Sequence, residues 1–254
     1  MNTEFSSKIN KLVHFWPKNA VLVDSWLKKQ GVNNDLKHAY FRSHWLTPLG
    51  HGAAIQHGAT VDLHGGLYAL QEQLKLSAHA GGKTALEEQG FGHFVRYQET
   101  EVWLFAAQKA HLPSWFMKHN WGPKIELVRS DFLPPKVGLI TKELGEFSFT
   151  LSSPERAILE ILYLVPDKQG IEEALLLFEG LTTLRPKLLQ ELLTNCQSIK
   201  VKRLFLFMAD RQQHPWVKRL DVSKTDLGHG KRSIVKGGML NKKYGITVPY
   251  GLGE

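Results

Sequence analysis

Apolar and polar positions recur with a helical period near the N-terminus of the chain. Residues 24–30 predict a short helix that ends at Gly31, because glycine readily terminates helices. A second helix is predicted to begin at Asn33 or Asn34, since either side chain can cap the first turn. The residues expected on its packing face are Leu36, Ala39, Tyr40 and Ser43. The pattern therefore predicts two helices joined by a short turn.

The segment after the second helix predicts a β-hairpin. Pro48 disfavours further helix, and residues 50–52, Gly-His-Gly, supply a turn before residues 53–56. Two helices followed by a hairpin form a winged helix-turn-helix, in which the second helix enters a groove of DNA. An ordinary helical corner with a hairpin and no ligand is the alternative.

The outward side of this segment carries mainly basic and polar side chains. Only Asp24 and Asp35 oppose the cations and histidines in or beside it, so duplex DNA would favour the surface. We predict phosphate contacts for the lysines and the histidine of the hairpin, and base contacts for the outward face of the second helix. The predicted DNA-binding residues are Lys28, Lys29, Asn34, Lys37, His38, Phe41, Arg42 and His51.

Two further helices are predicted around this unit. The first spans residues 8–16 and stops at Pro17, with Ile9, Leu12, Val13 and Trp16 as its buried stripe. The second opens at residues 61–64 and is weakened in its first turn by a Gly-Gly pair at 65–66. Its expected packing residues are Leu67, Leu70, Leu74 and Leu76.

The run Gly81-Gly82-Lys83-Thr84 invites comparison with a phosphate-binding loop, in which backbone amides and a lysine hold phosphates. Such a loop requires a glycine where this chain has Ser77, so the spacing does not fit. We expect a strand-to-helix turn here, followed by a short helix over residues 85–89 that Gly90 stops.

From Phe91 the pattern changes to short strands and then to helices rich in leucine. In the last helix we expect Val201, Leu204, Phe205 and Met208 to face inward, and Lys200, Lys202 and Arg203 to face outward. The predicted strands are 95–97, 101–106, 124–129, 138–141 and 146–151, and the predicted helices are 156–165, 171–181, 186–196 and 200–211. The predicted fold class is α+β, with a winged helix-turn-helix domain at 1–93 and a larger mixed α/β domain at 94–254.

Positive charge is concentrated at the C-terminal end. The formal net charge is +8, and an excess of the same size arises from Ile199 onward, where twelve Lys and Arg residues face four Asp and Glu residues. The glycine-punctuated tail 227–249 cannot fold alone. It either packs on its own domain through Ile234, Val235, Ile246 and Val248, or serves as an arm for an anionic partner. The basic residues of this tail are Lys231, Arg232, Lys236, Lys242 and Lys243.

Composition and motifs exclude several classes of protein. With 254 residues and 43% hydrophobic content the chain can bury a substantial core, and it has neither a signal-like N-terminus nor an apolar run long enough for a membrane span. We expect a cytoplasmic protein without a membrane partner. The single cysteine, Cys196, excludes an internal disulfide and is expected to be buried. The sequence contains no recognisable catalytic constellation, and the spacing of its histidines favours no metal site, so we predict no enzyme, metal or cofactor.

A set of motifs in a common order resembles a bacterial family, the abortive-infection type IV antitoxins of the AbiEi-like kind. The resemblance covers nearly the whole chain. The motifs are Trp26-Leu27 with Gly31, Asp35-Leu36 with Tyr40, Ser43-x-Trp45-Leu46, Gly50-x-Gly52, residues 65–71, residues 79–90, residues 153–157, Gly230-Lys231-Arg232, Lys236-Gly237-Gly238 and residues 242–249.

The resemblance implies an antitoxin with a winged N-terminal domain that represses its own operon and counters a nucleotidyltransferase-like toxin. The implied partners are double-stranded DNA at its own promoter, with inverted repeats, and a cognate toxin. Toxin binding and a second DNA contact both stay open for the basic tail, and the sequence leaves the oligomeric state open. A stand-alone winged-helix regulator, or an interaction scaffold without a toxin, is the alternative.

Overall fold

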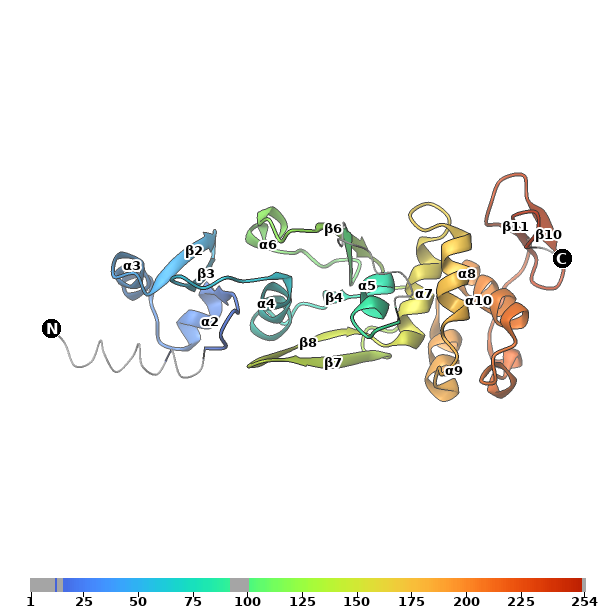
Figure 1. Cartoon of the computed structure of the whole chain (residues 1–254), viewed down its shortest axis with the longest axis horizontal. Coiled ribbons are helices and arrows are strands. Elements are labelled where there is room, and N and C mark those ends of the chain that lie inside the picture. Colours follow the sequence, from blue (N-terminus) through green and yellow to red (C-terminus); the bar gives the residue numbers. More distant parts are fainter. Residues whose placement is uncertain (1–11, 13–15, 92–100, 253–254) are drawn as a thin grey trace. The chain divides into compact units, whose positions relative to one another are not determined.

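The computed structural model describes residue 12, residues 16–91 and residues 101–252. Helices and strands are mixed along the chain, as the predicted α+β class requires (Figure 1). The chain forms two compact units: unit 1 comprises Met1–His79, Thr100–Arg129 and Thr141–Thr150, and unit 2 comprises Ala80–Glu99, Ser130–Ile140 and Leu151–Glu254. The domain boundary predicted after residue 93 lies outside the described residues and stays a prediction.

The N-terminal part of unit 1 is a winged helix-turn-helix, as predicted. Its strands form an antiparallel sheet with the order β1-β3-β2, so the strand before the first helix pairs with the wing. The elements are β1 (Leu22–Val23), α2 (Asp24–Lys29), α3 (Asn34–Arg42), β2 (Leu46–Gly50) and β3 (Ala53–Gln56). Leu12, Trp16, Leu27 and Tyr40 belong to the buried cluster beneath these elements. Most of the predicted first helix lies outside the described residues, but two of its four expected core residues are in this cluster.

The Gly-Gly pair after the wing is a packing requirement. Helix α4 (Leu63–Tyr68) contains Gly65 and Gly66 and continues into the π-helical segment η1 (Ala69–Gln73). A Cβ atom on Gly65 would lie 2.1 Å from the carbonyl oxygen of Asn19, and one on Gly66 would lie 2.6 Å from the Trp121 ring, so only glycine fits. The expected packing helix is confirmed for Leu67 and Leu70, which are buried, but Leu74 and Leu76 follow its last residue.

The strands that follow are distributed between the two units. In unit 1, β5 and β6 are parallel neighbours, and the short helix α6 (Ser114–Lys118) lies between them in sequence. The sheet to which they belong has the order β6-β5-β4-β8-β7. Its strands are β4 (His79–Ala80), β5 (Glu101–Ala106), β6 (Lys124–Arg129), β7 (Leu139–Leu144) and β8 (Phe147–Ser152). The structure thus confirms four of the predicted strands, and their observed ends agree with the predicted ends to within a few residues. The predicted strand 95–97 lies outside the described residues.

Unit 2 contains the leucine-rich helices. Helix α7 is buried along most of its length because it contacts α5, α8, α9 and α10 (Figure 1, yellow to orange for α7 to α10). The helices are α5 (Gly82–Glu87), α7 (Pro154–Leu164), α8 (Ile171–Glu179), α9 (Pro186–Asn195) and α10 (Ile199–Gln212).

Cys196, which follows α9, is buried as expected, and burial raises the pKa of its thiol to about 11.

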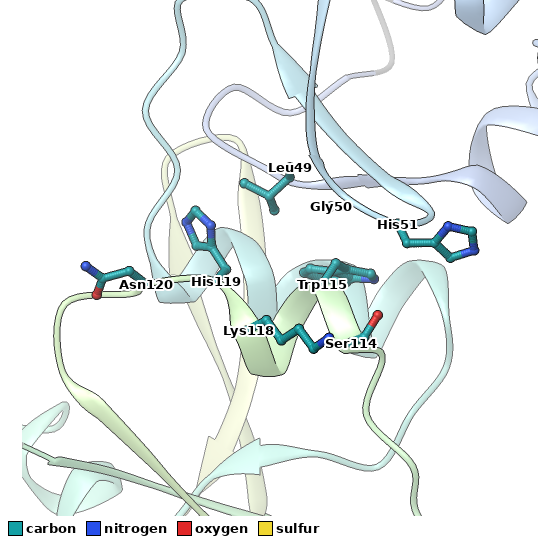
Figure 2. A pocket seen from close by; sticks show the side chains of 8 residues that line it. All are labelled: Leu49, Gly50, His51, Ser114, Trp115, Lys118, His119 and Asn120. Carbon is teal, nitrogen blue, oxygen red and sulfur yellow. The ribbon is translucent and has the colours of Figure 1, made fainter.

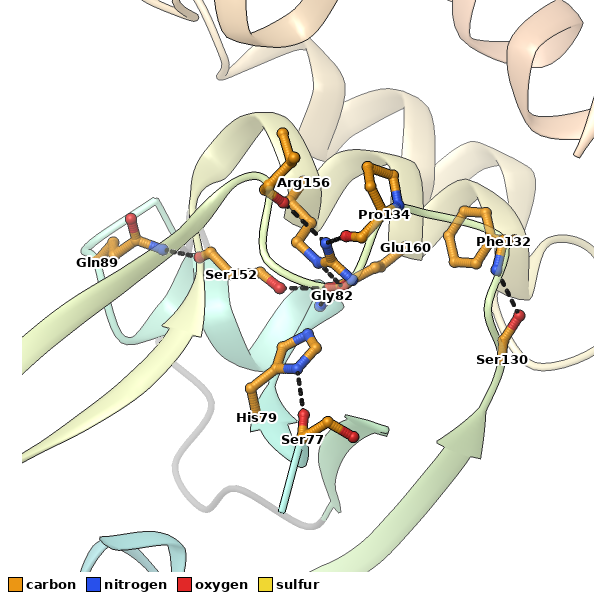
Figure 3. Close-up of polar contacts among 11 residues, drawn as sticks. Ser77, His79, Gly82, Gln89, Ser130, Phe132, Pro134, Ser152, Arg156 and Glu160 are labelled. Atoms are coloured by element: carbon orange, nitrogen blue, oxygen red, sulfur yellow. Dashed lines mark hydrogen bonds and ion pairs between the residues drawn. The ribbon is translucent and has the colours of Figure 1, made fainter. Parts of the chain in front are cut away.

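The turn that superficially resembled a phosphate-binding loop is filled by a carboxylate of the protein itself. Strand β4 leads into α5, which confirms the strand-to-helix turn. The backbone N–H of Gly82 and the hydroxyl of Ser152 both donate to Oε2 of Glu160, at 2.9 and 2.7 Å (Figure 3). Lys83, the lysine of the motif, forms an ion pair with Glu173 at 2.8 Å. The groups that would hold a phosphate are thus engaged with side chains of unit 2.

The basic tail packs on its own unit. Three short strands, β9 (Arg232–Ser233), β10 (Met239–Asn241) and β11 (Ile246–Val248), form a sheet with the order β10-β11-β9. The sequence offered packing of the tail on its own domain through four apolar residues as one of two alternatives. Three of the four, Ile234, Ile246 and Val248, are buried as this alternative requires, whereas Val235 is half-buried.

The inward and outward assignment of α10 was partly wrong. Its four expected core residues are buried, but Lys202 and Arg203 are only 3% and 5% exposed. The guanidinium of Arg203 donates to the carbonyl oxygens of Leu227, Gly228 and Gly230, at the start of the tail. The tail covers this side of α10, and a helical pattern alone cannot reveal a segment that folds back onto it.

Candidate nucleic-acid interface

Helix α3 is capped at its N-terminus and held along one side. The Asn33 side chain caps it by accepting a hydrogen bond from the Leu36 N–H at 2.9 Å, as predicted for this residue or its neighbour. The Lys37 ammonium lies 2.7 Å from Asp24, the first residue of α2. Tyr40 is fully buried on the inner face, and its burial raises the pKa of the hydroxyl. These contacts fix which side of α3 faces outward.

The outward side of α3 presents a polar face. Asn34, His38 and Arg42 are exposed, and they fall on one side of the helix because they are four residues apart. Asp35 is also exposed in the first turn, where a carboxylate is favoured by the helix dipole. Phe41 was predicted to belong to this face, but it is half-buried and packs against the core of the winged domain. Its ring and the His38 ring are in a T-shaped arrangement, with a centroid distance of 6.3 Å.

The predicted phosphate contacts fall into two groups. Lys28 and Lys29 are exposed in the last turn of α2, and His51 is exposed in the turn of the wing. Lys37 differs from them because its side chain is only 15% exposed and paired with Asp24. An ammonium in this position ties α3 to α2, so we regard Lys37 as a structural residue and keep the other three as candidates.

Further residues beside α3 are not among the predicted DNA-binding residues. Trp45 follows the helix and is 42% exposed, although large aromatic side chains are usually covered. The rings of His44 and His57 lie 5.0 Å apart, and Thr47 forms a hydrogen bond of 3.1 Å with His57. Exposure of an indole beside a polar helix face is typical of binding surfaces, and Trp45 could have been noticed from its place directly after the helix.

The second predicted site, on the tail, consists of exposed cations. The side chains of Lys231, Arg232, Lys236 and Lys242 are exposed on and between the tail strands. Lys243 is exposed too, but its ammonium pairs with Asp210, which also accepts a hydrogen bond from the Tyr244 hydroxyl. The hydrogen bond to Asp210, and after it the hydrogen bond to Tyr244, raise the pKa of Lys243. Four exposed cations of unit 2 therefore lie on or beside the strands of the tail sheet, and we call these four residues the basic surface of the tail.

Within residues 12, 16–91 and 101–252, no three His, Cys, Asp or Glu side chains converge as a metal site would require. None of the helices in the same ranges has both the length and the apolar character needed to cross a membrane.

Comparison with known proteins agrees with this architecture. A family described as "Transcriptional regulator, AbiEi antitoxin, Type IV TA system" matches residues 99–249, and one described as "Transcriptional regulator, AbiEi antitoxin N-terminal domain" matches residues 5–97. The crystal structure of the RV2827C protein from Mycobacterium tuberculosis is similar in fold, with a TM-score of 0.58 and 13% sequence identity. The alignment covers 97% of this chain and 92% of that chain. No curated protein sequence matches.

Proposed function

Because the chain belongs to the AbiEi antitoxin family of transcriptional regulators of type IV toxin-antitoxin systems, we propose that it binds double-stranded DNA through helix α3 and the wing. In this proposal it represses its own operon by binding inverted repeats in the promoter, and it counteracts a nucleotidyltransferase-like toxin. It acts in the cytoplasm by binding and carries out no reaction of its own.

One observation carries the DNA-binding half of the proposal. Asn34, His38 and Arg42 form an exposed polar face on the second helix of a winged helix-turn-helix, the element that enters the major groove in this motif. Arginine and asparagine can each make paired hydrogen bonds to base edges, whereas the exposed Lys28 and Lys29 can neutralise phosphates without reading sequence. The surface thus offers both kinds of contact that specific DNA recognition requires.

The antitoxin half of the proposal is supported by the basic surface of unit 2. The exposed cations at 231, 232, 236 and 242 would attract an acidic surface or a phosphate-bearing partner. The tail sheet packs on α10 through buried contacts, so the segment that carries the cations is already ordered. Binding a partner therefore costs less conformational entropy than it would for a flexible arm.

Replacing Arg42 by alanine tests the proposed recognition helix. We expect the affinity for duplex DNA from the chain's own promoter to fall by about 1 to 3 kcal/mol, because a bidentate contact to a base is lost. The helix should persist, since Arg42 is exposed at its last turn. Fluorescence anisotropy with promoter and scrambled duplexes measures the loss, with circular dichroism as the folding check. Arg219→Ala, at an exposed arginine of unit 2, is the matched control. Unchanged promoter affinity in folded Arg42→Ala would contradict the assignment.

The exposed lysines of α2 make a separate prediction about salt. If Lys28 or Lys29 neutralises a phosphate, its replacement by glutamine should make the slope of log affinity against log salt shallower by about 0.9. The preference for promoter over scrambled duplex should be retained, because phosphate contacts do not read sequence. Lys37→Gln is the internal comparison, since Lys37 already pairs with Asp24 and should leave this slope nearly unchanged. A full wild-type slope in both the Lys28 and Lys29 variants would remove α2 from the phosphate contacts.

A further inference from the structure

A polar cavity of about 300 Å³ lies between the wing and helix α6 of unit 1. The wing contributes the turn at Gly50 and His51, and α6 contributes Ser114 and Lys118. Figure 2 shows the wing turn facing α6, with His51 at one end of the cavity and His119 and Asn120 at the other. Helix α6 was not among the sites predicted from the sequence.

The wing and α6 are held together by close packing. A Cβ atom on Gly50 would lie 2.9 Å from the Cβ of Trp115, so the backbone of the wing reaches α6 as closely as glycine permits. Trp115 is itself buried, and its ring lies edge-on to those of Phe116 and Trp121. The wing turn and α6 are therefore adjacent on the surface of unit 1.

The chemistry of the cavity suits an anion. Its described lining includes an ammonium group from Lys118, two imidazole rings and a hydroxyl from Ser114, and no carboxylate. Lys118 and Ser114 are exposed, so a ligand can reach them from solvent. After α6 the chain is fixed by two hydrogen bonds, from the Trp121 indole to the Phe116 carbonyl oxygen and from the Gly122 N–H to the Asn120 side chain. The cavity is thus a preformed site with net positive character.

We propose that this cavity receives a backbone phosphate of the duplex that the wing contacts, so that α6 extends the DNA interface beyond the winged domain. The inference rests on the proposed DNA binding. A cavity of this size is larger than one phosphate group and leaves room for the adjoining sugar. Lys118 supplies the charge, and Ser114 and Asn120 supply uncharged hydrogen-bonding groups, a combination typical of phosphate contacts that position a protein without reading sequence.

The test compares Lys118→Gln with Lys109→Gln in the full chain, using duplex from the chain's own promoter. Lys109 is also an exposed lysine of unit 1, on the connection between β5 and α6, but it does not line the cavity. We expect the slope of log affinity against log salt to become shallower by about 0.9 for the Lys118 variant and to stay unchanged for the Lys109 variant. Gly50→Ala is a second variant that retains every charge but forces the wing away from Trp115. It should also weaken binding, provided that its thermal unfolding is close to that of the wild type.

The outcomes separate the two proposals. If Arg42→Ala weakens DNA binding but Lys118→Gln keeps the wild-type slope, the extension by α6 is wrong and the recognition helix stands. If the wild-type chain does not bind promoter duplex above scrambled duplex, the proposed function itself fails and the inference falls with it. A titration with inorganic phosphate, followed by NMR of the Lys118 and His119 signals, adds a third outcome. Saturable phosphate binding that leaves DNA affinity independent of Lys118 would make the cavity a site for a free anion.

Discussion

Replacing Glu160 by alanine is expected to lower the free energy of unfolding of unit 2 by about 3 to 5 kcal/mol, because it leaves a buried cation without its partner. Glu160 is fully buried, and its Oε1 accepts a hydrogen bond of 2.8 Å from Arg156, which is 6% exposed (Figure 3). Its other oxygen accepts from Gly82 and Ser152. One side chain thus joins α7 to the start of α5 and to the end of β8, and its loss leaves donors unsatisfied in three elements.

Chemical denaturation followed by circular dichroism measures this loss. Glu191→Ala, at an exposed glutamate of α9, is the matched control and should change stability by less than about 0.5 kcal/mol. A double variant, Arg156→Met with Glu160→Leu, should be more stable than Glu160→Ala alone, because it removes the buried charge along with its partner. If Glu160→Ala unfolds with wild-type stability, the buried pair does not support unit 2 as described.

The winged domain could be predicted from sequence because its signals are local. A glycine at the end of α2, an asparagine cap on α3 and a Gly-His-Gly turn each act within a few residues. The sequence did not reveal partners that other segments of the chain supply. Lys37 resembles a free cation until α2 places Asp24 beside it, and Arg203 resembles a surface residue until the tail covers it.

The cavity beside the wing could not be predicted for a similar physical reason. Gly50 and Trp115 are far apart in sequence, and no periodic pattern links the hairpin to α6. The Gly-Gly-Lys-Thr run could be dismissed as a phosphate loop from its spacing alone. The sequence could not show that Glu160, contributed by a helix much later in the chain, takes the position an anion would fill. Turns and caps that involve neighbouring residues could be predicted from the sequence. Side-chain partners that are far apart in the sequence could be identified only from the structure.

Ending the chain at Leu227 is expected to destabilise unit 2 severely as well as to abolish rescue from the cognate toxin. Truncation removes the buried side chains of Ile234, Ile246 and Val248, each worth about 1.5 to 3 kcal/mol when fully buried. It also removes the Gly228 and Gly230 carbonyl oxygens to which the buried Arg203 donates. A loss of this size approaches the whole stability of a typical domain, about 5 to 15 kcal/mol. DNA binding should be retained, because helix α3 and the wing belong to unit 1.

A charge variant separates the basic surface of the tail from its packing role. Glutamine at the four exposed tail cations keeps the buried side chains and the Arg203 contacts, so unit 2 should unfold at the wild-type temperature. We expect this variant to lose rescue when it is co-expressed with the cognate toxin at matched protein levels, because the surface proposed for an acidic or phosphate-bearing partner is neutralised. The four replaced residues are Lys231, Arg232, Lys236 and Lys242.

The control for this experiment removes the same number of exposed cations from elsewhere in unit 2. Its four replaced residues are Lys136, Lys187, Lys218 and Arg219. Both variants lower the net charge equally, so a general effect of charge would reduce rescue in both, whereas a binding surface on the tail would reduce it only in the tail variant. Full rescue by the folded tail variant would limit the tail to a packing role. If the tail variant instead lost promoter affinity and shortened the footprint on DNA while the control did not, the tail cations would belong to the DNA interface.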